Sequence, residues 1–277
     1  MLDDLELGEL TDDAIAGSWR VWQRRRGHRY SLDDLATAHM ACRLVPDALA
    51  YADLGCGLGS VLLMVAYKLP AEARLAGVEA QAVSFELARR NVRRNGDLLA
   101  DRTRLVLGDL RDPGARRDLG GPFGLITGTP PYFPAREATP STDPQRAAAR
   151  LELRGGVEAY LEAAGDLLAP GGTFVMCASA VAEGRGGAHA PMAGLRAARR
   201  RDVYPRVGRS RPLFTVWAFR RARGGGERPA PDPELTVEHP LHARDADGRR
   251  TEEHHDLRRF FDLAVNLGEP PSPGPRP

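Results

Sequence analysis

A glycine-rich turn preceded by an acid is the clearest chemical feature of the sequence. In the segment DLGCGLGS, Asp53 is followed by Gly55, Gly57 and Gly59 at alternate positions. Such a turn needs backbone that adopts positive φ and lets a ligand approach without a Cβ atom in the way. The spacing G-x-G-x-G differs from the G-x-G-x-x-G turn that binds a dinucleotide pyrophosphate. The carboxylate ahead of the glycines favours a cationic or amine-bearing ligand instead, such as the methionyl ammonium of S-adenosylmethionine.

Two further acids end apolar segments downstream. Glu79 ends RLAGVE, where a carboxylate can accept hydrogen bonds from both hydroxyls of a ribose. Asp109 and its neighbour Leu110 lie in the turn LGDLRD, where the carboxylate can accept from an adenine amine. Each acid alone could equally be a solvated loop residue or a helix cap. Together with Asp53 and the glycines, at successive strand ends, they predict a site for S-adenosylmethionine.

The segment FGLITGTPPYFP indicates where the chemistry would take place. Thr129, Pro130, Pro131 and Tyr132 follow an apolar run and are expected at the carboxyl edge of a sheet, beside a transferable methyl group. The alternative is a rigid turn whose tyrosine only packs. Displacement at a sulfonium needs mainly alignment of nucleophile and methyl group. His28 is therefore interpreted as a surface residue rather than as a catalytic base.

Apolar runs that alternate with helical patterns predict the elements that position these residues. Strands are expected at residues 50–53, 75–79, 104–107, 123–127 and 173–178, with helices at 31–45, 60–67, 82–91 and 156–168. Strands separated by crossover helices form a parallel sheet with right-handed connections. Residues 203–207 and 213–220 have no helix between them and predict a terminal antiparallel pair. The expected fold is α/β and Rossmann-like, with a mostly parallel sheet of seven strands.

The two ends of the chain differ from this central region. Residues 1–26 mix acidic and arginine-rich stretches and are interpreted as a lead-in to a domain at 27–220. Residues 221–268 are expected to form a linker, at 221–233, and a small appendage with an extended segment at 235–237, a turn at 245–248 and a helix within 251–264. The proline-rich residues 269–277 have the composition of a disordered tail.

Residues 8–220 resemble the bacterial tRNA adenine-N6 methyltransferases that modify an anticodon-loop adenine of valine tRNA. The matching segments are QRRRGHRYSLDDLATA, DLGCGLGS, the acid of AGVE, GDLRD, TPPYFP and ELRGGVEAYLEAAGDLLAPGGTF, and ELTVEHPLHARDADGRRTEEHHDLRRFF is similar to the end of that family. The resemblance implies a class I methyltransferase fold, S-adenosylmethionine as methyl donor and tRNA as acceptor. It also implies that Arg29, Tyr30 and Asp33 border the methionyl end of the cofactor. Asp33 can equally be a first-turn acid that complements the helix dipole.

One position departs from the family's Asn-Pro-Pro-Tyr, because this chain has Thr129 in place of the asparagine. In that family the side chain here and the next backbone carbonyl accept the two amine hydrogens, while the tyrosine, here Tyr132, stacks on the base. Acceptors aimed at developing charge promote catalysis, and a threonine hydroxyl can accept but is shorter than an amide. Amino methylation of adenine in tRNA stays the leading prediction. A protein glutamine amide, a guanine amine, a small molecule, or a catalytically degraded cofactor- and RNA-binding module are the alternatives.

Two dense arginine runs predict a phosphate track if both lie on the rim of the carboxyl edge. They are Arg24, Arg25 and Arg26, and Arg199, Arg200 and Arg201, the second continued by Arg206, Arg209 and Arg211. Their alternative is a solvated face rich in arginine. An anticodon-loop adenine would have to leave its stack to reach the pocket.

The bulk composition excludes several classes of protein. A net charge of +2 over 277 residues creates no global field that commits the chain to nucleic acid. Cys42, Cys56 and Cys177 form no CxxC or Cys/His pattern, so neither a metal site nor a disulfide framework is expected. The longest apolar run, residues 61–67, is too short to span a bilayer, and the N-terminus lacks a signal layout. A cytoplasmic protein is expected.

Overall fold

The computed structural model describes residues 4–134, 142–179, 183–221 and 234–265. In chain order its elements are α1 (Asp4–Leu7), β1 (Leu10–Ala16), β2 (Trp19–Arg24), α2 (Leu32–Leu44), β3 (Ala50–Leu54), α3 (Ser60–Lys68), β4 (Arg74–Glu79), α4 (Ala82–Arg94), α5 (Asp97–Asp101), β5 (Thr103–Leu107), α6 (Pro113–Leu119), β6 (Phe123–Gly128), α7 (Pro144–Arg150), α8 (Val157–Leu167), β7 (Leu168–Ser179), α9 (Glu183–His189), the 3-10 turn η2 (Ala190–Ala193), β8 (Leu195–Tyr204), β9 (Phe214–Arg221), β10 (Thr236–Val237), β11 (Leu241–His242) and α10 (Glu252–Phe260).

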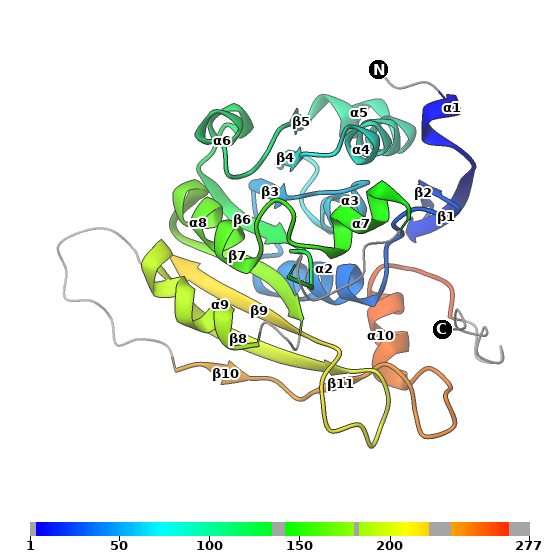
Figure 1. Ribbon diagram of the computed structural model, residues 1–277, viewed down its shortest axis with the longest axis vertical. Helices are drawn as coiled ribbons and strands as arrows, with labels where there is room; N and C mark the ends of the chain where they lie inside the picture. The colour runs from blue at the N-terminus through cyan, green and yellow to red at the C-terminus, as the bar shows by residue number, and fades with distance from the viewer. Residues whose placement is uncertain (1–3, 135–141, 180–182, 222–233, 266–277) are drawn as a thin grey trace.

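One large sheet, covered by helices on both faces, organises the molecule (Figure 1). Its strand order is β10-β8-β9-β7-β6-β3-β4-β5, and β11 also pairs with β8. The strands from β5 to β7 along this order are parallel, whereas β9 is antiparallel to both β7 and β8. This is the predicted seven-stranded sheet with its antiparallel pair, extended beyond β8 by two short strands. The bounds of β8 differ from the prediction, because the strand spans Leu195–Tyr204 and not residues 203–207.

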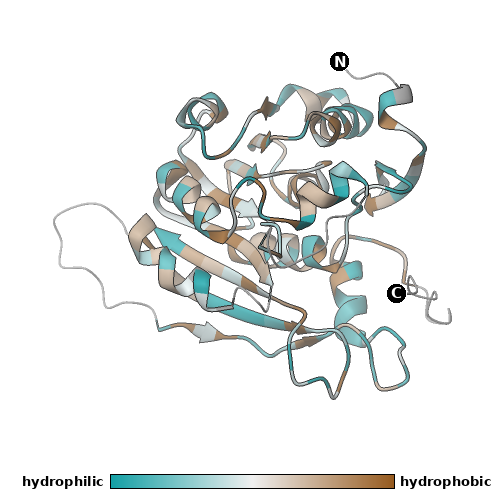
Figure 2. Ribbon diagram, in the orientation of Figure 1, coloured by the Kyte–Doolittle hydropathy of each residue, from teal (hydrophilic) through white to brown (hydrophobic). Residues whose placement is uncertain are grey.

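The core lies in two layers, one on each face of the sheet. Tyr51 and Leu75 pack with the apolar side chains of α2 and α3, whereas the next residues, Ala52 and Ala76, pack with those of α6 and α8. Successive residues of a strand point to opposite faces, so a strand covered on both sides is apolar throughout. Figure 2 shows this distribution, with hydrophobic residues along the central strands and hydrophilic ones over α10. The same continuous apolar runs made the central strands predictable.

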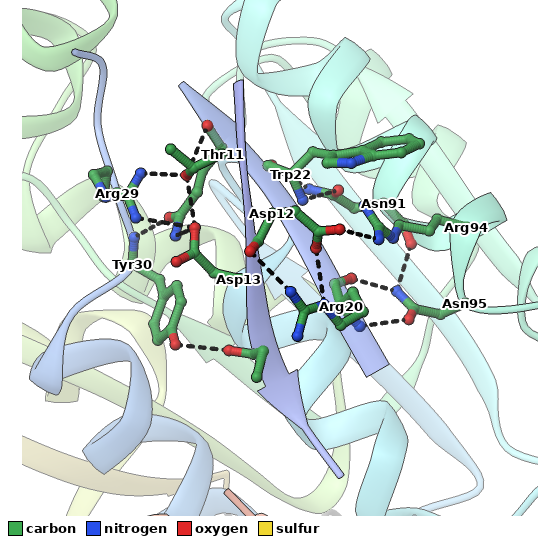
Figure 3. Close-up of polar contacts among 12 residues, drawn as sticks. Thr11, Asp12, Asp13, Arg20, Trp22, Arg29, Tyr30, Asn91, Arg94 and Asn95 are labelled. Atoms are coloured by element: carbon green, nitrogen blue, oxygen red, sulfur yellow. Dashed lines mark hydrogen bonds and ion pairs between the residues drawn. The ribbon is translucent and has the colours of Figure 1, made fainter. Parts of the chain in front are cut away.

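Residues 1–26 are more than a lead-in, which corrects the sequence interpretation. β1 and β2 pair as an antiparallel hairpin, and its Ile15 and Val21 are fully buried in the layer that contains α3. Asn91 of α4 locks the hairpin in place, because its amide accepts from the Trp22 backbone N at 2.7 Å and donates to the Trp22 O at 2.9 Å (Figure 3). The hairpin thus braces the helix that follows β4.

The C-terminal appendage is built into the same body. β10 and β11 both pair in parallel with β8, and α10 packs on α2, where the Phe260 ring lies 4.7 Å from His39 between centroids. The turn predicted at 245–248 is present, closed by the Gly248 N donating to the Asp245 O at 3.2 Å. Most of the predicted linker, residues 222–233, and the predicted tail at 269–277 lie outside the described residues.

Candidate active site

The glycine-rich turn joins β3 to α3 and has the backbone that the sequence predicts. Gly55, Gly57 and Gly59 have φ of +61°, +55° and +89°, a region that residues with a Cβ rarely adopt. A Cβ atom on Gly55 would lie 2.1 Å from the Tyr160 hydroxyl, whereas one on Gly57 would meet open space. The turn therefore packs closely against α8 at Gly55 and faces an opening at Gly57.

That opening is a pocket at the carboxyl edge of the sheet. The turn and the ends of β4, β5 and β6 form its walls, and residues of α7 and of the segment before α8 complete it. The lining includes these residues from the predicted site: Gly55, Gly57, Glu79, Asp109, Leu110, Thr129 and Pro131. Because the carboxyl ends of neighbouring parallel strands meet at one edge, residues far apart in sequence share this wall.

Glu79 ends β4 inside the pocket, with 7% of its surface exposed. Its Oε2 accepts from the Gly57 N at 2.9 Å and its Oε1 from the Gln81 N at 2.6 Å. Burial raises the pKa of this carboxyl, and the backbone donors at Gln81 and Gly57 offset part of the rise. A carboxylate oxygen has more than one acceptor position, so both oxygens keep capacity for hydroxyl donors from a ligand.

Asp109 follows β5 and lies on the pocket wall with Leu110. Arg111 donates to both carboxylate oxygens of Asp109, from Nε at 3.0 Å and from Nη2 at 2.7 Å. This contact holds the pKa of Asp109 below its ordinary value. The carboxylate is charged and already paired, whereas Leu110 is 7% exposed and supplies an apolar surface. Such a combination suits a flat heterocycle with an amine at its edge.

Asp53 does not line the pocket, which corrects its predicted place. It lies beneath the turn with 2% of its surface exposed. Its carboxylate accepts from the Thr127 hydroxyl at 2.7 Å, and that hydroxyl is 2.7 Å from the Tyr51 hydroxyl. Burial raises the pKa of Asp53 to about 7. The acid ahead of the glycines is thus part of a buried hydrogen-bond chain between β3 and β6.

A different acid, Asp34 in the first turn of α2, lies on the pocket wall. It accepts from the Ser60 hydroxyl and from the Ser31 N, both at 2.8 Å. Burial, followed by the nearby Asp33, raises the pKa of Asp34 to about 8.

The resemblance placed Arg29, Tyr30 and Asp33 at the methionyl end of the cofactor, but in the structure their side chains bind other parts of the chain. Asp33 binds Tyr132. Arg29 and Tyr30 are tied to the N-terminal hairpin, since Arg29 donates to Asp13 Oδ2 at 3.0 Å and the Tyr30 hydroxyl donates to the Ala14 O at 2.8 Å (Figure 3). Asp34 therefore takes the place on the pocket wall that the resemblance gave to its neighbour.

The Thr-Pro-Pro-Tyr segment leaves the end of β6 at the mouth of the pocket. Thr129 and Pro131 line it, while Pro130 is buried. The Tyr132 hydroxyl turns inward and donates to Asp33 Oδ2 at 2.6 Å. One face of its ring stacks on Phe214, with centroids 6.4 Å apart. The tyrosine is thus held by a carboxylate and an aromatic neighbour, so it is fixed in orientation beside Thr129.

Besides Asp34, the sequence interpretation did not place two other lining residues, His28 and Arg154, in the site. His28 lines the pocket rather than an outer surface, and burial lowers its pKa, so its imidazole is neutral near pH 7. Arg154 also lines the pocket, and its charge offsets a small part of the rise in the pKa of Glu79 and adds to the lowering of the pKa of Asp109. Arg154 lies in the segment ELRGG, ahead of a predicted helix. Nothing in that local sequence indicates that the arginine is near two acids at strand ends.

Sequence comparison shows that this chain is similar to release factor glutamine methyltransferases. The chain is 34% identical over 144 residues to the release factor glutamine methyltransferase of Chlorobaculum tepidum. This alignment covers 50% of this chain and 47% of the relative. The chain is also 37% identical over 98 residues to the enzyme of that name from Geobacter sulfurreducens. This alignment covers 35% of this chain and 31% of the relative. The chain therefore spans about half the length of these relatives or less. No family model matches it.

A solved structure matches most of this fold. The crystal structure of a predicted O-methyltransferase from Agrobacterium tumefaciens has a TM-score of 0.58, covering 86% of this chain and 100% of that chain at 20% identity. The chain shares the fold of this predicted methyltransferase. The predicted fold is confirmed, and both the relatives and this structural neighbour are named as methyltransferases. The comparisons do not extend this to tRNA as acceptor.

The arginine runs do not form an open track on this methyltransferase fold, which corrects that prediction. Most of their guanidinium groups bind other parts of the chain: Arg24 binds Asp143 and the Leu7 O, Arg25 binds Glu9, Arg199 binds Glu238, Arg200 binds Asp202, and Arg201 binds the His239 O. Arg26 is exposed. Arg199, Arg200 and Arg201 lie in the middle of β8, paired with β9, and not at the rim of the sheet, whereas Arg206, Arg209 and Arg211 follow the end of β8.

Within the described ranges, no group of three or more His, Cys, Asp or Glu side chains is placed to hold a metal ion. No helix in that part of the chain is long and apolar enough to cross a membrane. Cys42, Cys56 and Cys177 are buried and free.

Proposed function

We propose that this chain transfers a methyl group from S-adenosylmethionine to a planar NH₂ nitrogen. One observation carries the proposal: a single pocket brings together the glycine-rich turn, the strand-end acid Glu79 and the Thr129–Pro131 segment. Such convergence of polar groups in a concave site is typical of an active site. S-Adenosylmethionine supplies an electrophilic methyl group on a sulfonium, and the residues of the chain bind, orient and exclude water.

The charges of the pocket fit this cofactor. Asp34 and Glu79 both have raised pKa values, because burial disfavours their charged forms. A ligand that carries positive charge restores the charged form of such a carboxyl, and this cofactor has a sulfonium and an ammonium. We assign Glu79 to the ribose hydroxyls, Asp109 and Leu110 to the adenine, and Asp34 to the cationic end.

At the acceptor end, Thr129 is the residue that touches the reacting nitrogen in this proposal. Its hydroxyl and the Pro130 carbonyl accept the two amine hydrogens, which directs the nitrogen lone pair toward the methyl group. Preorganised acceptors of this kind act where charge develops in the transition state. The Tyr132 ring does not line the pocket, and its contacts with Asp33 and Phe214 hold the end of this segment in place.

The leading acceptor is adenine N6 in tRNA. Its support is the sequence resemblance over residues 8–220, which includes the acceptor segment, together with the similarity of the C-terminal appendage. The second candidate is a glutamine amide of a release factor, favoured by the curated relatives of Chlorobaculum and Geobacter. Both acceptors present a planar NH₂ group, so one site geometry serves either.

A transfer assay separates the two acceptors. The purified chain is incubated with methyl-labelled S-adenosylmethionine and either unmodified tRNA or unmodified release factor, with the Thr129→Val variant as control. Label in tRNA that digests to N6-methyladenosine supports the leading acceptor, and label in a glutamine-containing peptide supports the second. Absence of label from both substrates, at a cofactor concentration that saturates binding, would refute methyl transfer to these acceptors.

A further inference from the structure

A second hollow lies between the β8–β9 loop, residues 205–213, and the turn that follows β11, residues 243–250. Figure 1 shows the two loops side by side at the lower edge of the molecule, one yellow and one orange. Four arginines line the hollow: Arg206, Arg209, Arg211 and Arg244. We call this group the arginine hollow. It is distinct from the cofactor pocket, with which it shares no lining residue.

Backbone contacts, and not carboxylates, hold two of the arginines in place. Arg206 Nε donates to the Asp245 O at 3.1 Å, and Arg244 Nη1 donates to the Gly248 O at 2.7 Å. The loops themselves are joined by the Val207 N, which donates to the Arg244 O at 2.9 Å. A carbonyl orients a guanidinium without neutralising it, so both positive charges remain available to a ligand.

The other two arginines are exposed on the β8–β9 loop. Within the part of the chain that the structure describes, the guanidinium groups of Arg209 and Arg211 have no hydrogen-bond or ion-pair partner. One acid, Asp247, also lines the hollow, and backbone donors engage the neighbouring Asp245. Asp245 Oδ1 accepts from the backbone N of Asp247 and of Arg249, both at 2.9 Å, and Asp247 lies 3.9 Å from the Arg249 guanidinium. With four arginines and one aspartate in its lining, the hollow has an excess of positive charge.

Its position links it to the acceptor end of the active site. β8 runs antiparallel to β9, which runs antiparallel to β7, so the end of β8 lies at the carboxyl edge of the sheet. The loop of the hollow returns into Phe214, the first residue of β9, whose ring stacks on Tyr132. The arginine hollow and the Thr129 segment thus lie on the same edge, joined through an aromatic pair.

We propose that the arginine hollow binds the phosphate backbone of an RNA whose base enters the pocket. Guanidinium groups bind phosphate oxygens through two parallel donors, and four of them suit successive phosphates better than one small anion. Tyr204, next to the hollow, stacks on His242 with centroids 5.3 Å apart, and flat side chains beside cations are typical of RNA-binding surfaces. This inference rests on the proposed tRNA acceptor and assigns its docking site.

The test compares two double variants that remove the same charge. Arg209→Gln with Arg211→Gln removes two exposed guanidinium groups of the hollow. The control, Arg104→Gln with Arg117→Gln, removes two exposed ones near β5 and α6, at the amino edge of the sheet. Binding of unmodified tRNA, and of a short RNA hairpin with an unpaired adenine, is measured by fluorescence anisotropy at several salt concentrations. Unfolding temperature and S-adenosylmethionine affinity are measured alongside.

We expect the hollow variant to bind RNA at least about tenfold more weakly. The slope of log affinity against log salt should fall by roughly 0.7–0.9 for each phosphate that the variant no longer neutralises, and the control should keep the slope of the parent. Parent-like RNA binding by the hollow variant would overturn the inference and leave the proposed function intact. Failure of the parent to bind RNA at low salt, or binding of a release factor instead, would overturn both the inference and tRNA as the acceptor, and would leave the glutamine amide as the candidate. Parent binding to RNA without methyl transfer would overturn the acceptor alone.

Discussion

Replacement of Glu79 by alanine tests the cofactor site most directly. Its carboxylate ends β4 in the pocket and already organises the backbone amides of Gly57 and Gln81. If it also accepts from two ribose hydroxyls, each of those hydrogen bonds to a charged group contributes about 1.5–3 kcal/mol. Water replaces part of this in the variant, and about 1.4 kcal/mol corresponds to a factor of ten. We expect Glu79→Ala to weaken S-adenosylmethionine binding at least about tenfold.

Calorimetric titration measures the affinity, and thermal or urea unfolding reports the fold. Loss of the acceptor for two backbone amides should lower the free energy of unfolding by about 1–3 kcal/mol. Glu79→Gln keeps an acceptor oxygen and should fall between parent and alanine variant in affinity. The matched control is Glu72→Ala, which removes an exposed carboxylate just before the other end of β4. Unchanged cofactor affinity in a folded Glu79→Ala protein would remove this residue from the site.

Two further predictions concern Thr129 and Asp34. Thr129→Val removes the hydroxyl but nearly keeps the shape of the side chain, and should lower the rate of methyl transfer by about 10²–10³ with little change in cofactor affinity. Thr129→Asn should hold or raise the rate on adenine. Normal turnover by the valine variant would exclude the hydroxyl from the chemistry. The pKa of Asp34 is raised from 3.8 to about 8, so the folded protein binds a proton there that the unfolded chain releases. Without cofactor, the free energy of unfolding should therefore fall as the pH rises from about 4 through about 8. In Asp34→Asn this dependence on pH should be weaker. Over the upper part of that range, cofactor affinity should rise with pH as the carboxyl deprotonates, and a pH-independent affinity, measured by titration at fixed ionic strength, would exclude Asp34 from contact with the cationic end.

Periodicity and residue type were sufficient to predict the central sheet. Buried parallel strands must be apolar throughout, and tight turns after them need glycine, so DLGCGLGS and the acids Glu79 and Asp109 marked consecutive strand ends before any contact was known. The N-terminal hairpin gave no such signal, because most of its residues are only partly buried and its few buried ones are separated by polar and charged residues. Its place depends on Asn91, more than sixty residues away.

Only the tertiary structure decided which acids face the cofactor pocket. Asp33 and Asp34 are adjacent on the first turn of α2, where successive side chains diverge by about 100°, and the Ser31 cap turns Asp34 to the pocket and leaves Asp33 to Tyr132. Asp53 precedes the glycines, yet a threonine of the neighbouring strand binds it beneath the turn.

The availability of the arginine side chains also depends on the tertiary structure. Their sequence runs showed where positive charge is dense, but a charge becomes available to a ligand only if no carboxylate of the folded chain lies beside it. Arg199 and Arg200 lie next to Glu238 and Asp202, whereas Arg209 and Arg211 line a hollow. Local sequence determines which backbone conformations form, because those depend on near neighbours and burial. Pairing of charges depends on residues brought together from distant parts of the chain, and the sequence alone does not state those distances.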